Sequence, residues 1–185
     1  MEGPSDEDLM LRYAGGDAGA FDLLYRRHRG PLYRFLLRQL GDPASAEELF
    51  QDVWMRVINA RDRYEVRAKF STWVYAIAHN RLMDFHRAAS RAVLLDQEQS
   101  ESALAEIAAP EIEAALQLDR KRAAVRLLAA LAELPEAQRE AFVLQQEGDL
   151  SLEEIAAVTG VSRETVKSRL RYAVAKLRLN LGGKP

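Results

Sequence analysis

Apolar and polar positions follow a helical period along most of the chain, and glycine and proline fall mainly between the periodic segments. The pattern is clear at 44–60, where apolar side chains recur at the spacing of one helix face. We find no stretch with the alternation expected of a strand. The pattern therefore predicts an all-α protein with a first helix between Ser5 and Gly15 and further helices over about 17–40, 44–60, 70–90, 112–133 and 135–148.

Helix boundaries are predicted by capping and breaking residues. Ser5 followed by Asp8 resembles a capping box, and Gly15-Gly16 would close that helix. Gly30-Pro31 predicts a kink or break inside 17–40. Pro135 suits the first position of the helix that ends near Gly148.

The composition changes after residue 91. Residues 92–119 contain seven acids and no Lys or Arg, and the stretch that ends near Pro110 has no aromatic residue. We interpret 92–111 as an acidic, partly disordered linker between two helical domains, 1–91 and 112–185. A linker of about 20 residues spans at most ~70 Å, so the two domains could contact well-separated targets.

Composition excludes several classes of function. The chain has no cysteine, which rules out disulfides and thiol chemistry, and its acidic N-terminus resembles no secretory signal. No stretch approaches the ~20 apolar residues of a membrane helix, so we expect a soluble, cytoplasmic protein. The three histidines lack acids at ligand spacing, and we expect no metal, cofactor, small-molecule substrate or catalytic residue.

The strongest motif lies at 151–178. Ser151 and Glu154 form a capping box, Gly160 suits a tight turn, and Ser162 can cap a second helix. This order predicts a helix-turn-helix whose second helix enters a major groove. A solvated helical hairpin is the plainer alternative. The predicted DNA contacts are Ser162, Arg163, Glu164, Thr165, Lys167, Ser168 and Arg171.

A second informative stretch covers 46–88. Acid and amide side chains lie off the apolar stripe of its first helix and form either a docking face or a merely solvated face. Aromatic and basic residues then alternate, as in sites for single-stranded nucleic acid, although Trp73 could equally belong to the core. The docking candidates are Glu48, Gln51, Asp52, Met55 and Arg56, and the strand-binding candidates are Lys69, Phe70, Trp73, Asn80, Arg81 and Arg87.

Together these motifs resemble the extracytoplasmic-function (ECF) group of bacterial sigma-70-type RNA polymerase sigma factors. "AEELFQDVWMRV" is similar to the region 2.2 helix that docks on the core polymerase. "FSTWVYAIAHNRLMDFHR" is similar to regions 2.3 and 2.4, which melt and read the −10 element. The C-terminal helix-turn-helix is similar to region 4, which reads the −35 element.

The resemblance implies partners as well as a function. The docking candidates would meet the β′ clamp of the polymerase core, within an assembly that includes the β subunit. The strand-binding candidates would capture the −10 element, and the helix-turn-helix would read the −35 duplex of promoter DNA. Members of the group are commonly held by an anti-sigma factor linked to the membrane, so a soluble chain held at the inner membrane is expected.

Two other functions remain open from the residues alone. An autonomous helix-turn-helix regulator would explain 151–178 but not 46–88. An enzyme acting on DNA would need converging acids, whereas Glu47-Glu48 and Glu153-Glu154 are adjacent on helices and do not share a face.

Overall fold

The computed structural model describes residues 3–95 and 114–182, and these residues form helices and connecting turns with no strand. The predicted all-α class is confirmed. The helices are α1 Asp6–Ala14, α2 Ala18–Leu40, α3 Pro43–Ala60, the short 3-10 helix η1 Arg61–Arg63, α4 Phe70–Leu95, α5 Ala114–Ala132, α6 Glu136–Gly148, α7 Leu152–Thr159 and α8 Arg163–Leu181.

Several predicted caps are confirmed. The Ser5 hydroxyl accepts a hydrogen bond from the Asp8 amide at 3.1 Å, and Ser162 does the same for Thr165 at 3.2 Å. At α7 the capping box is complete, because Ser151 and Glu154 each accept from the other's backbone amide. These short-range contacts decide where three of the helices begin.

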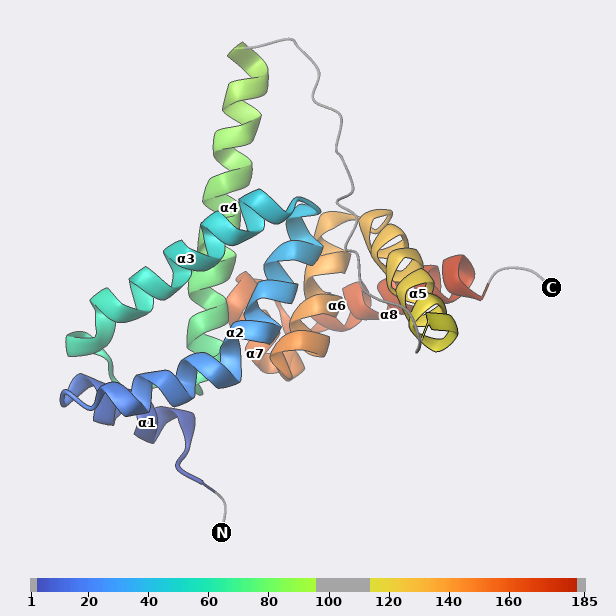
Figure 1. Cartoon of the computed structure of the whole chain (residues 1–185). Coiled ribbons are helices and arrows are strands. Elements are labelled where there is room, and N and C mark those ends of the chain that lie inside the picture. The colour runs from blue at the N-terminus through green and yellow to red at the C-terminus, as the bar shows by residue number, and fades with distance from the viewer. Residues whose placement is uncertain (1–2, 96–113, 183–185) are drawn as a thin grey trace.

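One boundary differs from the prediction, and one prediction is narrowed. The sequence predicted a kink or a break at Gly30-Pro31; α2 continues through Pro31, so there is no break, and Figure 1 shows the helix changing direction partway along its length. A proline removes one backbone hydrogen bond, but Leu24 before it and Phe35 after it are both fully buried, so packing on both sides holds the helix continuous. Pro135 is the N-cap of α6, one residue before the position we predicted.

The fourth helix is longer than predicted. It continues through the start of the predicted linker to Leu95, and its second half projects beyond the other helices (Figure 1). Residues 87–91 of this helix are exposed. The rest of the linker, 96–111, lies outside the described residues.

Helices α1–α4, here called the N-terminal group, enclose a core of large apolar side chains. Each helix contributes at least one residue with no exposed surface, because its apolar positions recur at helical spacing. An aromatic cluster of Phe21, Tyr25, Phe50 and Trp54 joins α2 to α3. The fully buried members of this core include Leu9, Leu24, Phe35, Val53, Phe70, Val74 and Leu82.

Helices α5–α8, here called the C-terminal group, pack around the apolar stripe of α8. Val166, Leu170, Ala173 and Leu177 are buried at intervals of three and four residues. At the end of α8, Lys176 donates to the Glu133 carbonyl at 2.5 Å and Asn180 donates to its carboxylate at 2.7 Å. These contacts fix the end of α8 to the segment between α5 and α6.

The two groups pack directly against each other: α2 lies against α6, and α4 lies against α7 (Figure 1). Their buried apolar residues form one continuous cluster. Gly148, the last residue of α6, sits against Tyr75 of α4, and a Cβ atom added to Gly148 would lie 3.0 Å from the tyrosine ring. This contact is tighter than most that a Cβ atom makes, so a larger residue at position 148 would push against the tyrosine ring.

Candidate nucleic-acid interface

The helix-turn-helix predicted at 151–178 is present as α7, a turn and α8. Gly160 ends α7 with φ +69°, a left-handed conformation that L-residues with side chains rarely adopt. Val166 and Leu170 face the core from the first half of α8. The opposite side of that helix is therefore free to meet a partner.

The predicted base and phosphate contacts lie on that free side. Ser162, Arg163, Glu164, Thr165, Lys167 and Arg171 are exposed, and Ser168 is half-buried. Arg163 pairs with Glu153 of α7 at 2.5 Å, and this contact holds the pKa of the Glu153 carboxyl below its usual value. The structure thus brings the whole predicted set together at one end of α8.

The predicted docking residues follow the outer side of α3. Glu48, Gln51, Arg56 and Met55 are exposed, and Met55 has 52% of its surface accessible. Asp52 is half-buried because it forms ion pairs with Arg81 of α4 and, at 3.7 Å, with Arg56.

The predicted strand-binding residues divide into two sets. Phe70 has no exposed surface, so in this conformation its ring offers no face for a base to stack on. Lys69, Asn80 and Arg87 are exposed, and Trp73 is half-buried with its ring centroid 5.0 Å from that of Tyr64. Trp73 therefore combines packing with partial access to solvent.

A groove with a volume of about 590 Å³ lies between α3 and α4. Its lining includes both docking candidates and strand-binding candidates predicted from the sequence. Docking candidates from α3 line one wall, and strand-binding candidates from α4 line the other. Arg81 bridges them, since it pairs with Asp52 across the groove and with Asp84 at 3.0 Å on its own helix. The lining residues from the two sets are Asp52, Met55, Arg56, Trp73, Asn80 and Arg81.

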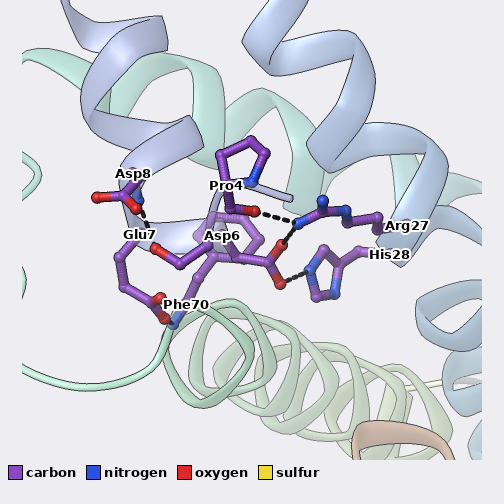
Figure 2. Close-up of polar contacts among 8 residues, drawn as sticks. Pro4, Asp6, Glu7, Asp8, Arg27, His28 and Phe70 are labelled. Carbon is purple, nitrogen blue, oxygen red and sulfur yellow. Dashed lines mark hydrogen bonds and ion pairs between the residues drawn. The ribbon is translucent and has the colours of Figure 1, made fainter. Parts of the chain in front are cut away.

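The first helix, which sequence reasoning did not connect with the site, holds the start of α4 (Figure 2). The Glu7 carboxylate accepts a hydrogen bond from the Phe70 amide at 2.6 Å. A carboxylate is a favourable partner there, because the first amides of a helix have no acceptor within it and carry a partial positive charge.

Asp6 anchors α1 to α2 (Figure 2). Its two oxygens lie 2.6 Å from Arg27 and 2.6 Å from His28, and the hydrogen bond with His28 is the main reason that the pKa of Asp6 is lowered. Beside this anchor, burial and then the charges of Glu7 and Asp6 raise the pKa of the Tyr64 hydroxyl to about 12. Pairs more than 20 residues apart leave no signal in local periodicity, which is why they were missed.

Lys69 contacts the C-terminal group, although most of its side chain is exposed. Its ammonium lies 3.1 Å from the Glu154 carboxylate, which also accepts from Thr72 at 3.2 Å. Partial burial of Glu154 opposes ionisation, but the hydrogen bonds from Ser151 and Lys69 outweigh it and lower the pKa to about 2. Glu154 is therefore ionised at neutral pH while it contacts a predicted DNA-binding cation.

Neither a metal cluster nor a membrane-spanning helix accompanies these surfaces in the described part of the chain. No three His, Cys, Asp or Glu residues within 3–95 and 114–182 are grouped as metal ligands. Across those same ranges, no helix has the length and apolar character needed to cross a bilayer.

A helix-turn-helix combined with a second helical surface that carries aromatic and basic residues is typical of a DNA-binding protein. Residues 24–92 match the family model for Sigma-70 region 2, and residues 124–177 match that for Sigma-70 region 4. The exposed end of α8 and the α3–α4 groove lie within these two matches.

Full-length relatives agree with both matches. The chain is 35% identical to the RNA polymerase sigma factor CarQ of Myxococcus xanthus, over 94% of this chain and 95% of CarQ. It is 30% identical to the ECF RNA polymerase sigma factor SigK of Mycobacterium sp. (strain KMS), over 96% of this chain and 92% of SigK. The chain belongs to the sigma-70 family and is an RNA polymerase sigma factor of the ECF group.

Solved structures share the fold. The sigma factor RpoE in complex with the anti-sigma factor NepR from Bartonella quintana matches with a TM-score of 0.73 and 25% identity, over 89% of this chain and 98% of RpoE. CnrH in complex with the cytosolic domain of CnrY matches with a TM-score of 0.68 and 26% identity, over 98% and 100% of the two chains.

Replacing Glu7 by alanine is expected to lower the free energy of unfolding by about 1 kcal/mol, the usual cost of losing a helix cap. Urea denaturation followed by circular dichroism measures this. Asp22→Ala is the control, because it removes an exposed acid that lies outside the first turn of its helix. Equal losses in the two variants would contradict a capping role for Glu7.

Proposed function

We propose that the α3–α4 groove and the exposed end of α8 are the two surfaces with which this sigma factor works. The outer side of α3 docks on the polymerase core at the β′ clamp, α4 and the loop before it engage the −10 element, and α8 reads the −35 duplex. The single observation that supports this most directly is the position of the seven recognition residues, none of them buried, opposite the buried stripe of α8.

The −35 contacts follow from the chemistry of α8. Hydroxyl and carboxylate groups in its first turn can reach base edges in a major groove, as in other helix-turn-helix proteins. Arg163, Lys167 and Arg171 supply positive charge for phosphates, which provides most of the affinity.

The −10 contacts follow from the aromatic and polar residues of α4. Extruding a base costs a few kcal/mol, and stacking on an aromatic ring returns about 1–3 kcal/mol per base. Trp73 and Asn80 line the groove and reach solvent, so they are the residues that can receive a base. The buried Phe70 supports Trp73, because their ring centroids lie 5.8 Å apart.

This function divides the chain into domains. Residues 1–91 form the region 2 domain, 92–111 the linker and 112–185 the region 4 domain. Because α4 continues to Leu95, the rigid part of the first domain extends into the predicted linker. Each domain makes a small DNA contact, and joining them to one polymerase raises the effective concentration of the second contact once the first has formed.

The partners follow from the family. Promoter DNA and the polymerase core are the working partners, and the protein acts by binding and not as an enzyme. An anti-sigma factor is a third partner: the similar RpoE and CnrH structures are complexes with NepR and with the cytosolic domain of CnrY. We place the chain in the cytoplasm, with retention at the inner membrane where such a partner is membrane-linked.

Transcription in vitro with core polymerase across a promoter library tests the proposal. We expect initiation at promoters with two conserved elements, and weak binding to the same DNA without polymerase. An autonomous helix-turn-helix regulator would give the reverse: tight binding of the chain alone and no polymerase-dependent initiation.

Charge reversal at Glu48 tests the docking surface. Glu48→Lys is expected to weaken core-polymerase binding about tenfold, because an exposed acid facing a basic partner is replaced by a like charge. Asp22→Lys, a charge reversal at an exposed residue of α2, is the control, because the ion pair of Asp22 with Arg26 lies at the surface. Asp52 is a poorer choice, because its reversal would also repel Arg56 and Arg81 inside the fold. Equal affinities for both variants, measured by polymerase pull-down, would contradict docking through α3.

Removing the charge of Lys167 tests the −35 surface. Lys167→Ala is expected to weaken binding of the polymerase complex to −35 duplex DNA and to reduce the slope of log affinity against log salt by about 1. Lys176→Ala is the control, since Lys176 lies on the same helix but is hydrogen-bonded to Glu133. A salt titration measures both slopes, and an unchanged slope for Lys167→Ala would place this residue away from phosphate.

A further inference from the structure

The segment before α4 is fixed to α1 at both of its ends. At its start, the guanidinium of Arg61 lies over the ring of Tyr13, 5.5 Å from the ring centroid. At its end, the Phe70 amide donates to the Glu7 carboxylate at 2.6 Å (Figure 2). Residues 65–69 between these two points are all exposed. This exposed loop therefore spans two points that α1 fixes.

The residue that precedes α4 cannot cap it. Lys69 takes that position, since its carbonyl accepts a hydrogen bond from the Trp73 amide at 3.1 Å. A lysine ammonium is only a donor, so it cannot accept from the first amides of a helix. Glu7 supplies the acceptor from 63 positions away in the chain, and its negative charge suits a helix N-terminus. The direction of the first turn of α4 thus depends on a residue of α1.

The ring of Phe70 is held from the same side (Figure 2). It has no exposed surface, and the centroid of the His28 ring lies 5.0 Å from its own. His28 is in turn hydrogen-bonded to Asp6 at 2.6 Å. Two adjacent acids of α1 therefore hold this one residue, Glu7 at the backbone and Asp6, through His28, at the ring.

Trp73 packs on two residues that α1 holds. Its ring centroid lies 5.0 Å from that of Tyr64 and 5.8 Å from that of Phe70. Burial and, after it, the nearby charges of Glu7 and Asp6 raise the pKa of Tyr64, which places its hydroxyl beside the start of α1. Trp73 also lines the groove. The position of its ring in the groove is therefore set by a helix that contributes no residue to the groove lining.

A ring that is fixed before DNA arrives favours strand opening. Stacking an extruded base on a mobile ring also costs the freedom that the ring then loses, whereas a fixed ring has already lost it. The gain from stacking and the cost of extrusion are similar in size. A small loss of order at the ring is therefore enough to slow opening.

We propose that Glu7 and Tyr64 are positioning residues of the −10 site: they fix the loop 65–69 and the ring of Trp73 before DNA binds, and so set the rate of strand opening. Neither residue contacts DNA in this role. The effect on opening rests on the proposed function of Trp73, whereas the effect on the ring is measured in the free chain. Because the region 2 match begins at residue 24, α1 lies outside it.

Fluorescence of the free chain tests the positioning. The chain has two tryptophans, and Trp54→Phe leaves Trp73 as the only one while it keeps an aromatic ring in the α2–α3 cluster. Acrylamide quenching then measures how accessible the Trp73 ring is. In this background we expect Glu7→Ala to raise the quenching constant. Glu7→Gln should keep the parent value, because its amide oxygen can still accept from the Phe70 amide.

Two changes at Tyr64 give an independent comparison. Among the described residues its hydroxyl has no hydrogen-bond partner, so Tyr64→Phe keeps the ring contact and loses no hydrogen bond. Tyr64→Leu removes the ring that packs on Trp73, and we expect it to raise quenching and to slow opening. Tyr64→Phe is expected to change neither.

Strand opening is followed with core polymerase on a promoter found in the library, by the reactivity of thymines in its −10 element with permanganate over time. Glu7→Ala is expected to slow opening about fivefold, the effect of a lost helix cap that falls wholly on this step, and Glu7→Gln to restore most of the rate. Asp42→Ala is the matched control, because Asp42 caps α3 by accepting from the Ser45 amide at 2.8 Å. Each variant is measured at saturating core polymerase, so that differences in docking do not enter.

Each outcome decides one part of the proposal. Quenching of Trp73 that is equal in Glu7→Ala and its parent would overturn the positioning role. Equal slowing of opening by Asp42→Ala and Glu7→Ala would reduce the effect to a loss of stability and overturn it as well. Raised quenching with an unchanged opening rate would overturn the link to strand opening. A parent protein that opens no promoter would contradict the proposed function, whereas quenching would still decide the positioning.

Discussion

The structure depends on α4 meeting different neighbours on different sides of a single helix. Val74, Ala78 and Leu82 enter the core of the N-terminal group, and Tyr75 and His79 meet the C-terminal group. The groove is lined from α4 by Trp73, Ile77, Asn80, Arg81 and Asp84. A helical turn has fewer than four residues, so each turn of α4 supplies one core contact, one interface contact and one groove residue. The groove and the contact with the C-terminal group are both positioned by the direction of that one helix.

The sequence predicted the parts of this arrangement that are local. The caps at Ser5, Ser151 and Ser162 and the turn at Gly160 each depend on residues within four positions of one another. Buried stripes in α3 and α8 could be predicted in the same way, from apolar spacing alone. These signals were enough to locate the helix-turn-helix and the residues that it exposes.

Contacts distant in sequence could not be predicted. The three histidines have no acid at ligand spacing in the sequence, but in the structure His28, His79 and His86 each lie beside one carboxylate at least 22 positions away. The sequence left both a kink and a break open at Gly30-Pro31, and burial on both sides of Pro31 decides against the break. The ion pairs of Lys69 with Glu154 and of Arg81 with Asp52 likewise form only through tertiary packing, so the sequence could not predict them.

The hydrogen bond from the Phe70 amide to Glu7 has a consequence for how the protein is divided into pieces. The region 2 match begins at residue 24, so α1 falls outside it. A fragment cut at that boundary would retain every proposed −10 residue and still lack the acceptor that orients the first turn of α4. A fragment designed from the family boundaries would therefore lose the contact between α1 and α4, because α1 lies outside the matched residues.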